Sequence, residues 1–144
     1  MIRSAVLQDA PAVARLMCAL WPSHTVREME EEAAALLRSP DAEIVLYEED
    51  GQPVGFAQCG LRRDYVEGTE TSPVGYLEGV YVSPTLRHRG VARTLVDCCA
   101  DWARKQGCAE FASDCELDNA DSLAFHLAAG FTEANRIICF TKKL

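Results

Sequence analysis

The stretch EGVYVSPTLRHRGVA, residues 78–92, joins a strand-like apolar run to the start of a helix. Three basic side chains surround Gly90 here, although the whole chain has a net charge of −8. A helix that follows Gly90 leaves its first N–H groups unpaired, and its dipole adds partial positive charge. Because glycine also admits a ligand close to the backbone, the pattern predicts an anion site suited to a diphosphate. An ordinary turn with a solvated basic face is the alternative reading of this motif when it stands alone.

The elements around this stretch predict one α/β domain over residues 1–144. Downstream, the pattern indicates a helix over 90–106, a strand over 109–114, a helix over 119–129 and a last strand near 136–142. Strand–helix–strand order implies a right-handed crossover and locally parallel strands. Upstream we expect a strand at 2–6, helices from residue 10 to before Pro22 and over 26–38, and a hairpin around Asp50 and Gly51. The sum is a mixed, mostly antiparallel sheet with helices on both faces.

The charge, the hydropathy and the cysteine content of the chain indicate which partners and which compartment to expect. With 14 basic and 22 acidic residues the chain is unsuited to nucleic acid, and its field favours a cationic partner, although net charge also serves solubility. No apolar run approaches the roughly 20 residues of a membrane span, and the N-terminus does not read as a signal peptide. Seven cysteines without a C-x-x-C pair argue against a disulfide framework and a zinc site. We therefore expect a cytoplasmic protein with reduced thiols, no metal and no membrane contact.

Two motifs in this order resemble those of the GNAT acetyltransferases, which transfer an acetyl group from acetyl-CoA to an amine. Their pyrophosphate loop [RQ]-x-x-G-x-[GA] is matched by Arg87, Gly90 and Ala92, and their later Asn, helix and Gly-Phe by Asn119, Gly130 and Phe131. The resemblance implies acetyl-CoA as cosubstrate, a parallel strand pair that splays apart, and a strand near Val80 that pairs with the pantetheine arm. The cofactor-binding residues expected on this basis are Val80, Tyr81, Val82, Arg87, His88, Arg89, Gly90, Val91, Ala92, Asn119 and Ser122.

His126 stands seven residues after Asn119, where many members of this family carry a tyrosine that protonates the departing thiolate. Asn119, Ser122 and His126 fall on one helix face. Because histidine can act as an acid near neutral pH, His126 is a catalytic candidate. The alternative is a structural histidine without a catalytic duty.

Two acids are the candidates for holding and deprotonating the acceptor amine. Glu78 interrupts an otherwise apolar strand, and its position two residues before Val80 predicts that both lie on the same strand face. Asp114 ends the neighbouring strand, and ligands bind at the C-terminal ends of parallel strands. A carboxylate there can accept the proton that an amine loses during acetyl transfer.

More local stretches resemble the aminoglycoside 6′-N-acetyltransferases, a branch of the same family. They are LWPSH, RDYVEG, SPVGYLEGVYV and ASD, and they imply an acceptor pocket made of Trp21, His24, Tyr65, Glu78 and Asp114. Acids would pair with the amines of such a polycation, and aromatic faces would pack on its rings. For Trp21 and Tyr65 core packing is the alternative. Asn135 stands where some relatives carry an acid, which bears on the substrate range.

The resemblance also implies a homodimer of C₂ symmetry in which residues near 133–140 lie at or across the interface. A C-terminal strand that folds back on its own sheet and leaves a monomer is the alternative. We therefore expect an enzyme that acetylates the 6′-amine of aminoglycosides by direct attack in a ternary complex. One alternative is an acetyltransferase that acts on another small amine, such as a polyamine or an amino acid, or on a protein N-terminus. A different alternative is a module that binds CoA or an aminoglycoside without turnover.

Overall fold

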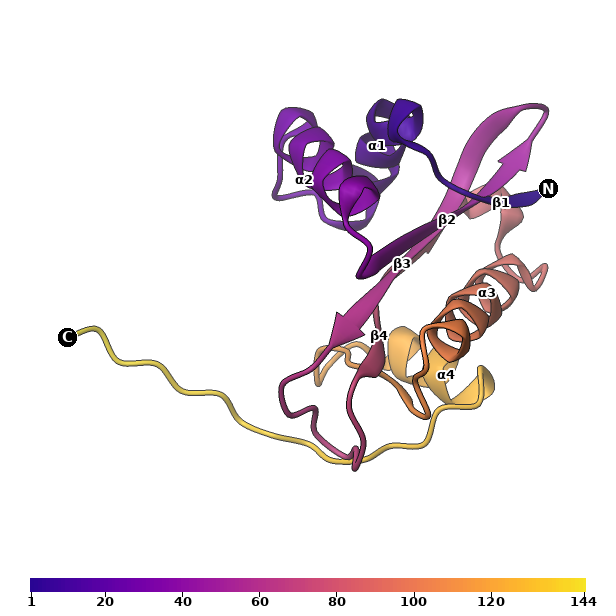
Figure 1. Cartoon of the computed structure of the whole chain (residues 1–144). Helices are drawn as coiled ribbons and strands as arrows, with labels where there is room; N and C mark the ends of the chain where they lie inside the picture. The colour runs from indigo at the N-terminus through magenta and orange to yellow at the C-terminus, as the bar shows by residue number, and fades with distance from the viewer.

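A computed structural model describes all 144 residues and arranges them around one five-stranded sheet (Figure 1). In spatial order the strands are β1 (Ile2–Ser4), β2 (Ala42–Glu49), β3 (Gln52–Arg62), β4 (Val74–Val82) and β5 (Phe111–Ser113). The first three neighbouring pairs are antiparallel, and β4 and β5 run parallel. The predicted mixed sheet is confirmed, and so is the hairpin, whose turn places Asp50 and Gly51 at positive φ.

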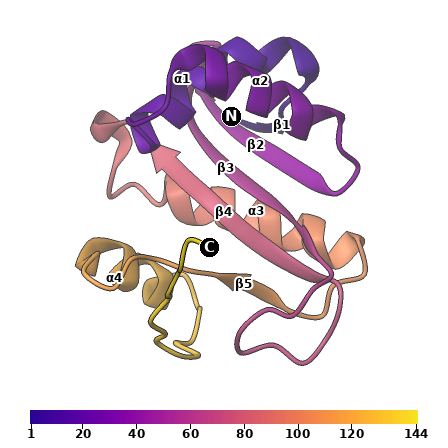
Figure 2. The ribbon, with the colours of Figure 1, turned by 90° about the vertical axis from the view of Figure 1, so that its left-hand side faces the viewer.

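The helices cover both faces of the sheet, as the amphipathic spacing predicts. Helices α1 (Ala10–Leu20) and α2 (Val26–Arg38) lie on one side, and α3 (Val91–Lys105) lies on the other (Figures 1 and 2). Helix α4 (Ala120–Ala128) lies beside β5 (Figure 2). Each face has its own apolar cluster, with Met17 and Phe56 in the first and Leu77 and Leu95 in the second. No helix is both long enough and apolar enough to cross a membrane, and all seven cysteines are free thiols.

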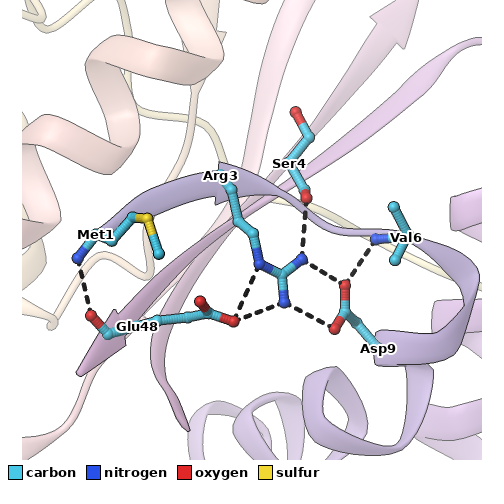
Figure 3. Close-up of polar contacts among 6 residues, drawn as sticks. All are labelled: Met1, Arg3, Ser4, Val6, Asp9 and Glu48. Carbon is cyan, nitrogen blue, oxygen red and sulfur yellow. Dashed lines mark hydrogen bonds and ion pairs between the residues drawn. The ribbon is translucent and has the colours of Figure 1, made fainter. Parts of the chain in front are cut away.

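Arg3 anchors the short edge strand β1 to the rest of the domain (Figure 3). Its guanidinium donates to both carboxylate oxygens of Asp9, at 2.7 and 2.9 Å, and to Oε1 of Glu48 at 2.6 and 3.0 Å. The guanidinium of Arg3 is the main cause that holds the pKa of Asp9 below its usual value. One fork of charge-assisted hydrogen bonds thus joins β1, β2 and the turn before α1, far from the parallel strands.

The parallel strands part after three residues. Pairing between β4 and β5 joins Gly75 to Phe111 and ends with Leu77 opposite Ser113, whereas β4 continues to Val82. This confirms the splayed parallel pair. Strand β5 is also shorter than the predicted strand 109–114. The backbone of β4 beyond Leu77 therefore has a free edge on the side facing β5, which a ligand can use.

A β-bulge lies at the same point. Gln58 pairs with Gly79 and Cys59 pairs with Leu77, so that Glu78 is an extra residue without a partner on β3. Leu77 and Val80 consequently pack into the same cluster under α3. The expectation that Glu78 shares a face with Val80 is therefore wrong, because the bulge shifts the two-residue alternation by one position.

The C-terminal segment follows Phe131, contacts Glu67 through Asn135 and then extends into solvent (Figure 1). Residues 132–144 belong to no helix or strand, so the predicted strand near 136–142 is wrong for a single chain. A strand needs a paired edge, and this segment pairs with none of the five strands. Ile137, Ile138 and Phe140 are accordingly 65%, 80% and 86% exposed.

Candidate active site

The basic loop between β4 and α3 has the backbone of an anion site. After the short helix η2 (Pro84–Leu86), His88 and Gly90 adopt positive φ angles of 62° and 77°. Alternation of this kind turns successive N–H groups toward a common point. Helix α3 begins at Val91 with Gly90 as its N-cap, and no side chain caps its first N–H groups. A Cβ on Gly90 would meet no atom within 4 Å, so the approach to these groups is open.

The two arginines of this loop each contact the end of a strand. Arg87 donates from Nε to the carbonyl of Val82 at 3.4 Å, which ties the loop to the end of β4. Arg89 forms a loose ion pair with Glu49 at 3.7 Å and remains exposed. The diphosphate site at residues 87–92 stays a prediction, and the basic side chains and the uncapped helix start support it.

Glu78 and Asp114 stand where β4 and β5 part, and two further side chains link them. Arg62, the last residue of β3, donates to Oε1 of Glu78 from Nη2 at 2.8 Å and from Nε at 3.3 Å. Its guanidinium carbon lies 3.4 Å from the centre of the Tyr76 ring. The Tyr76 hydroxyl in turn donates a short hydrogen bond to Oδ2 of Asp114. The result is a continuous row of contacts that runs Glu78, Arg62, Tyr76, Asp114.

The electrostatics of this row keep its donors protonated. Burial, followed by the hydrogen bond to Asp114, raises the pKa of Tyr76 well above its usual value. The pKa of Arg62 is also raised, because its hydrogen bond and charge interaction with Glu78 outweigh the opposing effect of burial. At neutral pH the hydroxyl and the guanidinium are therefore both donors, and each donates to one of the two carboxylates.

Sequence reasoning missed Arg62 and Tyr76. Tyr76 sits in an apolar strand and reads as a core residue, which it is, with a side chain almost wholly buried. Its position two residues before Glu78 is the signal that could have placed both on one face. Arg62 gives no such signal, because its nearness to Glu78 depends on the register between β3 and β4.

His126 lies in the last turn of α4, between two serines. Its Nδ1 is 2.7 Å from the carbonyl oxygen of Ser122, and its Nε2 is 2.8 Å from Oγ of Ser113. Because a carbonyl only accepts, Nδ1 carries a proton. Both ring nitrogens are thus engaged within the chain, and handing a proton to a ligand would cost one of these bonds. The catalytic role of His126 stays a prediction.

Asn119 begins α4 as its N-cap, where Oδ1 accepts from the backbone N–H of Ser122 at 3.1 Å. The predicted cofactor residues Asn119 and Ser122 are therefore adjacent and joined by the capping bond. Arg93, in the first turn of α3, donates to the carbonyl of Ala128 at 2.8 Å. This bond holds the end of α4 against the start of α3, where the diphosphate is expected.

The other predicted acceptor residues make contacts of their own. Trp21 ends α1 and packs edge-to-face on Phe56 at 6.2 Å, and its indole fills the space over Gly79 so closely that a Cβ there would be 2.7 Å away. Trp21 is thus a packing residue that also lies against Gly79, the residue after Glu78. His24 pairs with Glu28 at 3.2 Å. Tyr65 is 78% exposed on the loop 63–73.

Glu110 fixes the loop that carries Tyr65. Its Oε1 accepts from the backbone N–H groups of Glu70 and Thr71, at 2.9 and 2.8 Å. Near the other end of the loop, the side-chain amide of Asn135 donates to Glu67 at 2.8 Å. The start of the C-terminal segment therefore lies directly beside the loop that carries Tyr65, a predicted acceptor residue.

Comparison with known proteins shows which family the sequence matches. Residues 11–131 match the model of the acetyltransferase (GNAT) family. The chain is 42% identical over 143 residues to aminoglycoside N(6′)-acetyltransferase type 1 of Stenotrophomonas maltophilia. The aligned region covers 99% of this chain and 93% of that protein. The chain is 39% identical to the protein of the same name from Klebsiella aerogenes, over 100% of this chain and 97% of the relative.

Solved structures show the same arrangement of elements. The structure of AAC(6′)-Iy in complex with the bisubstrate analogue CoA-S-monomethyl-acetylneamine superposes with a TM-score of 0.95 at 34% identity, over 100% of this chain and 98% of that one. The apo structure of the aminoglycoside 6′-N-acetyltransferase AAC(6′)-Ig from Acinetobacter haemolyticus gives a TM-score of 0.94 at 38% identity, over 100% and 99%.

Proposed function

The chain belongs to the acetyltransferase (GNAT) family, and from this premise we propose that it transfers an acetyl group from acetyl-CoA to the 6′-amine of aminoglycosides. The observation that carries the proposal is the position of Glu78 and Asp114 at the parting of β4 and β5. That parting also exposes the edge of β4, which leads directly into the basic loop at 87–92. A thioester laid along this edge would meet an amine held by the two acids.

The proposed chemistry is direct attack in a ternary complex. The lone pair of the acceptor nitrogen forms a bond to the thioester carbonyl carbon, and the carbon–sulfur bond breaks to release the CoA thiolate. The proton lost by the nitrogen goes to Asp114 or Glu78, directly or through water. A backbone N–H of β4 near Val80 polarises the carbonyl, and residues 87–92 hold the diphosphate. The thiolate takes up a proton from His126 or from water.

The test is release of free thiol from acetyl-CoA with a panel of amines. We expect turnover with kanamycin and none with spermidine, because a polyamine lacks the sugar rings that Trp21 and Tyr65 would contact. An analogue with a 6′-hydroxyl in place of the amine should bind in calorimetry and release no thiol. Turnover with spermidine but not with kanamycin would contradict the aminoglycoside assignment. Binding of both ligands without thiol release would favour a non-catalytic module.

We also propose that the enzyme works in the cytoplasm as a homodimer. Seven free thiols suit a reducing compartment. The case for a dimer comes from the C-terminal segment, which carries Ile137, Ile138 and Phe140 exposed on an extended backbone. Strand β5 is the outermost strand of the sheet and offers an unpaired edge. A second copy would cover both the apolar side chains and the edge if the two chains placed residues 133–140 at or across a two-fold interface.

Sedimentation equilibrium at micromolar concentration tests the dimer. We expect a species of twice the chain mass of 15.8 kDa, because the exposed apolar segment gains cover only in an assembly. A chain truncated after Asn135 keeps the bond to Glu67 but loses the apolar residues, and it should sediment as a monomer. A full-length protein that sediments cleanly at 15.8 kDa would reject the dimer.

A further inference from the structure

Arg62 is the one cation that pairs with Glu78 or Asp114, and it bonds to only one oxygen of the Glu78 carboxylate. Both of its hydrogen bonds to Glu78 end on Oε1, which leaves Oε2 of that carboxylate available to a ligand. The flat guanidinium is seated on the Tyr76 ring at 3.4 Å, an arrangement that restricts where it can hold Glu78. Tyr76 itself is fixed, because it is buried and donates to Asp114.

We propose that Arg62 is a positioning residue for the acceptor amine, which holds Glu78 by one oxygen so that the other receives the ammonium group. The proposal rests on the acetyl transfer proposed above. Glu78 occupies a bulge and has no cross-strand partner on β3, so the ladder alone does not fix its side chain. Arg62, seated on Tyr76, provides the missing support. The same Tyr76 holds Asp114, so the separation of the two carboxylates is set by a single stacked pair.

The proposed role of Arg62 requires both the charge and the planar shape of its guanidinium group. Glu78 is half-exposed and Arg62 more so, with side chains 35% and 44% accessible, so the ion pair alone is weak. Stacking on the ring adds direction to this weak pair, and only a planar guanidinium can stack and donate in the same geometry. A lysine at this position would keep the charge and lose the orientation.

The test compares Arg62→Met with the matched variant Arg63→Met. Arg63 is the next residue and pairs with Asp41 at 2.7 Å, outside the row of contacts at the site. We expect Arg62→Met to raise both the KM for kanamycin and its calorimetric Kd about fivefold, the size of effect that an exposed charge pair supports. The kcat and the acetyl-CoA affinity should change little. Arg62→Lys should fall between the wild type and Arg62→Met, and Arg63→Met should leave all four constants unchanged.

A double-variant cycle shows whether Arg62 acts through Glu78. In the Glu78→Gln background, Arg62→Met should produce no further rise in KM, since the group that it positions is already altered. An equal rise in both backgrounds would overturn the proposal. So would a lower KM in Arg62→Met, which would mean that Arg62 competes with the substrate cation.

Failure of the inference is distinct from failure of the proposed function. A wild type that releases no thiol with any aminoglycoside refutes acetyl transfer, whereas a fully active wild type with an unaltered Arg62→Met refutes only the role of Arg62. The Kd for kanamycin is measured on the complex with CoA, where no turnover occurs. This binding constant therefore tests the role of Arg62 whether or not the enzyme releases thiol.

Discussion

Asp114→Ala lowers kcat for a 6′-amine by ~10²-fold or more if a carboxylate takes the amine proton. The substitution removes the acid that follows β5 and the acceptor of the Tyr76 hydroxyl, and it leaves the loop at 87–92 unchanged. The affinity for acetyl-CoA should therefore stay at the wild-type value. Steady-state thiol release with kanamycin measures the fall in kcat, and calorimetry with acetyl-CoA confirms that the cosubstrate site is intact.

Two variants separate the carboxylate from its surroundings. Tyr76→Phe keeps Asp114 and removes the hydrogen bond that holds it, so its loss of kcat should be smaller than that of Asp114→Ala. Glu116→Ala removes an exposed acid two residues further along the same loop and should behave as wild type. Wild-type kinetics in both Asp114→Ala and Glu78→Ala would show that the amine is bound elsewhere.

Gly90→Glu abolishes acetyl-CoA binding. A side chain at this position enters the open space in front of the uncapped helix start, and a carboxylate there repels the diphosphate. The substitution also forces a non-glycine residue to adopt a φ of 77°, at a conformational cost of about 1–2 kcal/mol. Calorimetric titration with acetyl-CoA measures the loss.

The matched control lies at the other end of the same helix. Gly107 follows α3, has a φ of 90° and also has no atom within 4 Å of an added Cβ. Gly107→Glu therefore imposes a comparable backbone cost and the same charge, and it should bind acetyl-CoA with wild-type affinity. If Gly90→Glu retained full affinity as well, the diphosphate would not lie at this loop.

The sequence allowed prediction of the elements that local chemistry governs. Helix α2 agrees with its predicted bounds, because its apolar stripe is regular and Thr25 caps it. The hairpin follows from Asp50 and Gly51, and the start of α3 follows from Gly90. Glu78 and Asp114 could be proposed as the two acids of the acceptor site. Glu78 interrupts an apolar strand, and Asp114 ends the neighbouring predicted strand.

What escaped prediction depends on pairing between distant segments. The bulge at Glu78 is a property of the β3–β4 register, and nothing in the run YLEGVYV marks the extra residue. The contact between Arg62 and Glu78 depends on the same register. The strand expected near 136–142 has the composition of a strand, but composition does not supply an edge, and the single chain provides none to this segment.

The bulge at Glu78 makes this one residue dispensable for the pairing of β3 with β4. With that residue left out, Leu77 and Gly79 would be consecutive and would face Cys59 and Gln58, which are themselves consecutive, so the ladder would close without an irregularity. Side chains further along β4 would keep the faces that they have now. Deletion of Glu78 alone would therefore remove the acid and leave the β3–β4 ladder regular, so the extra residue serves the placing of this carboxylate and not the pairing of the sheet.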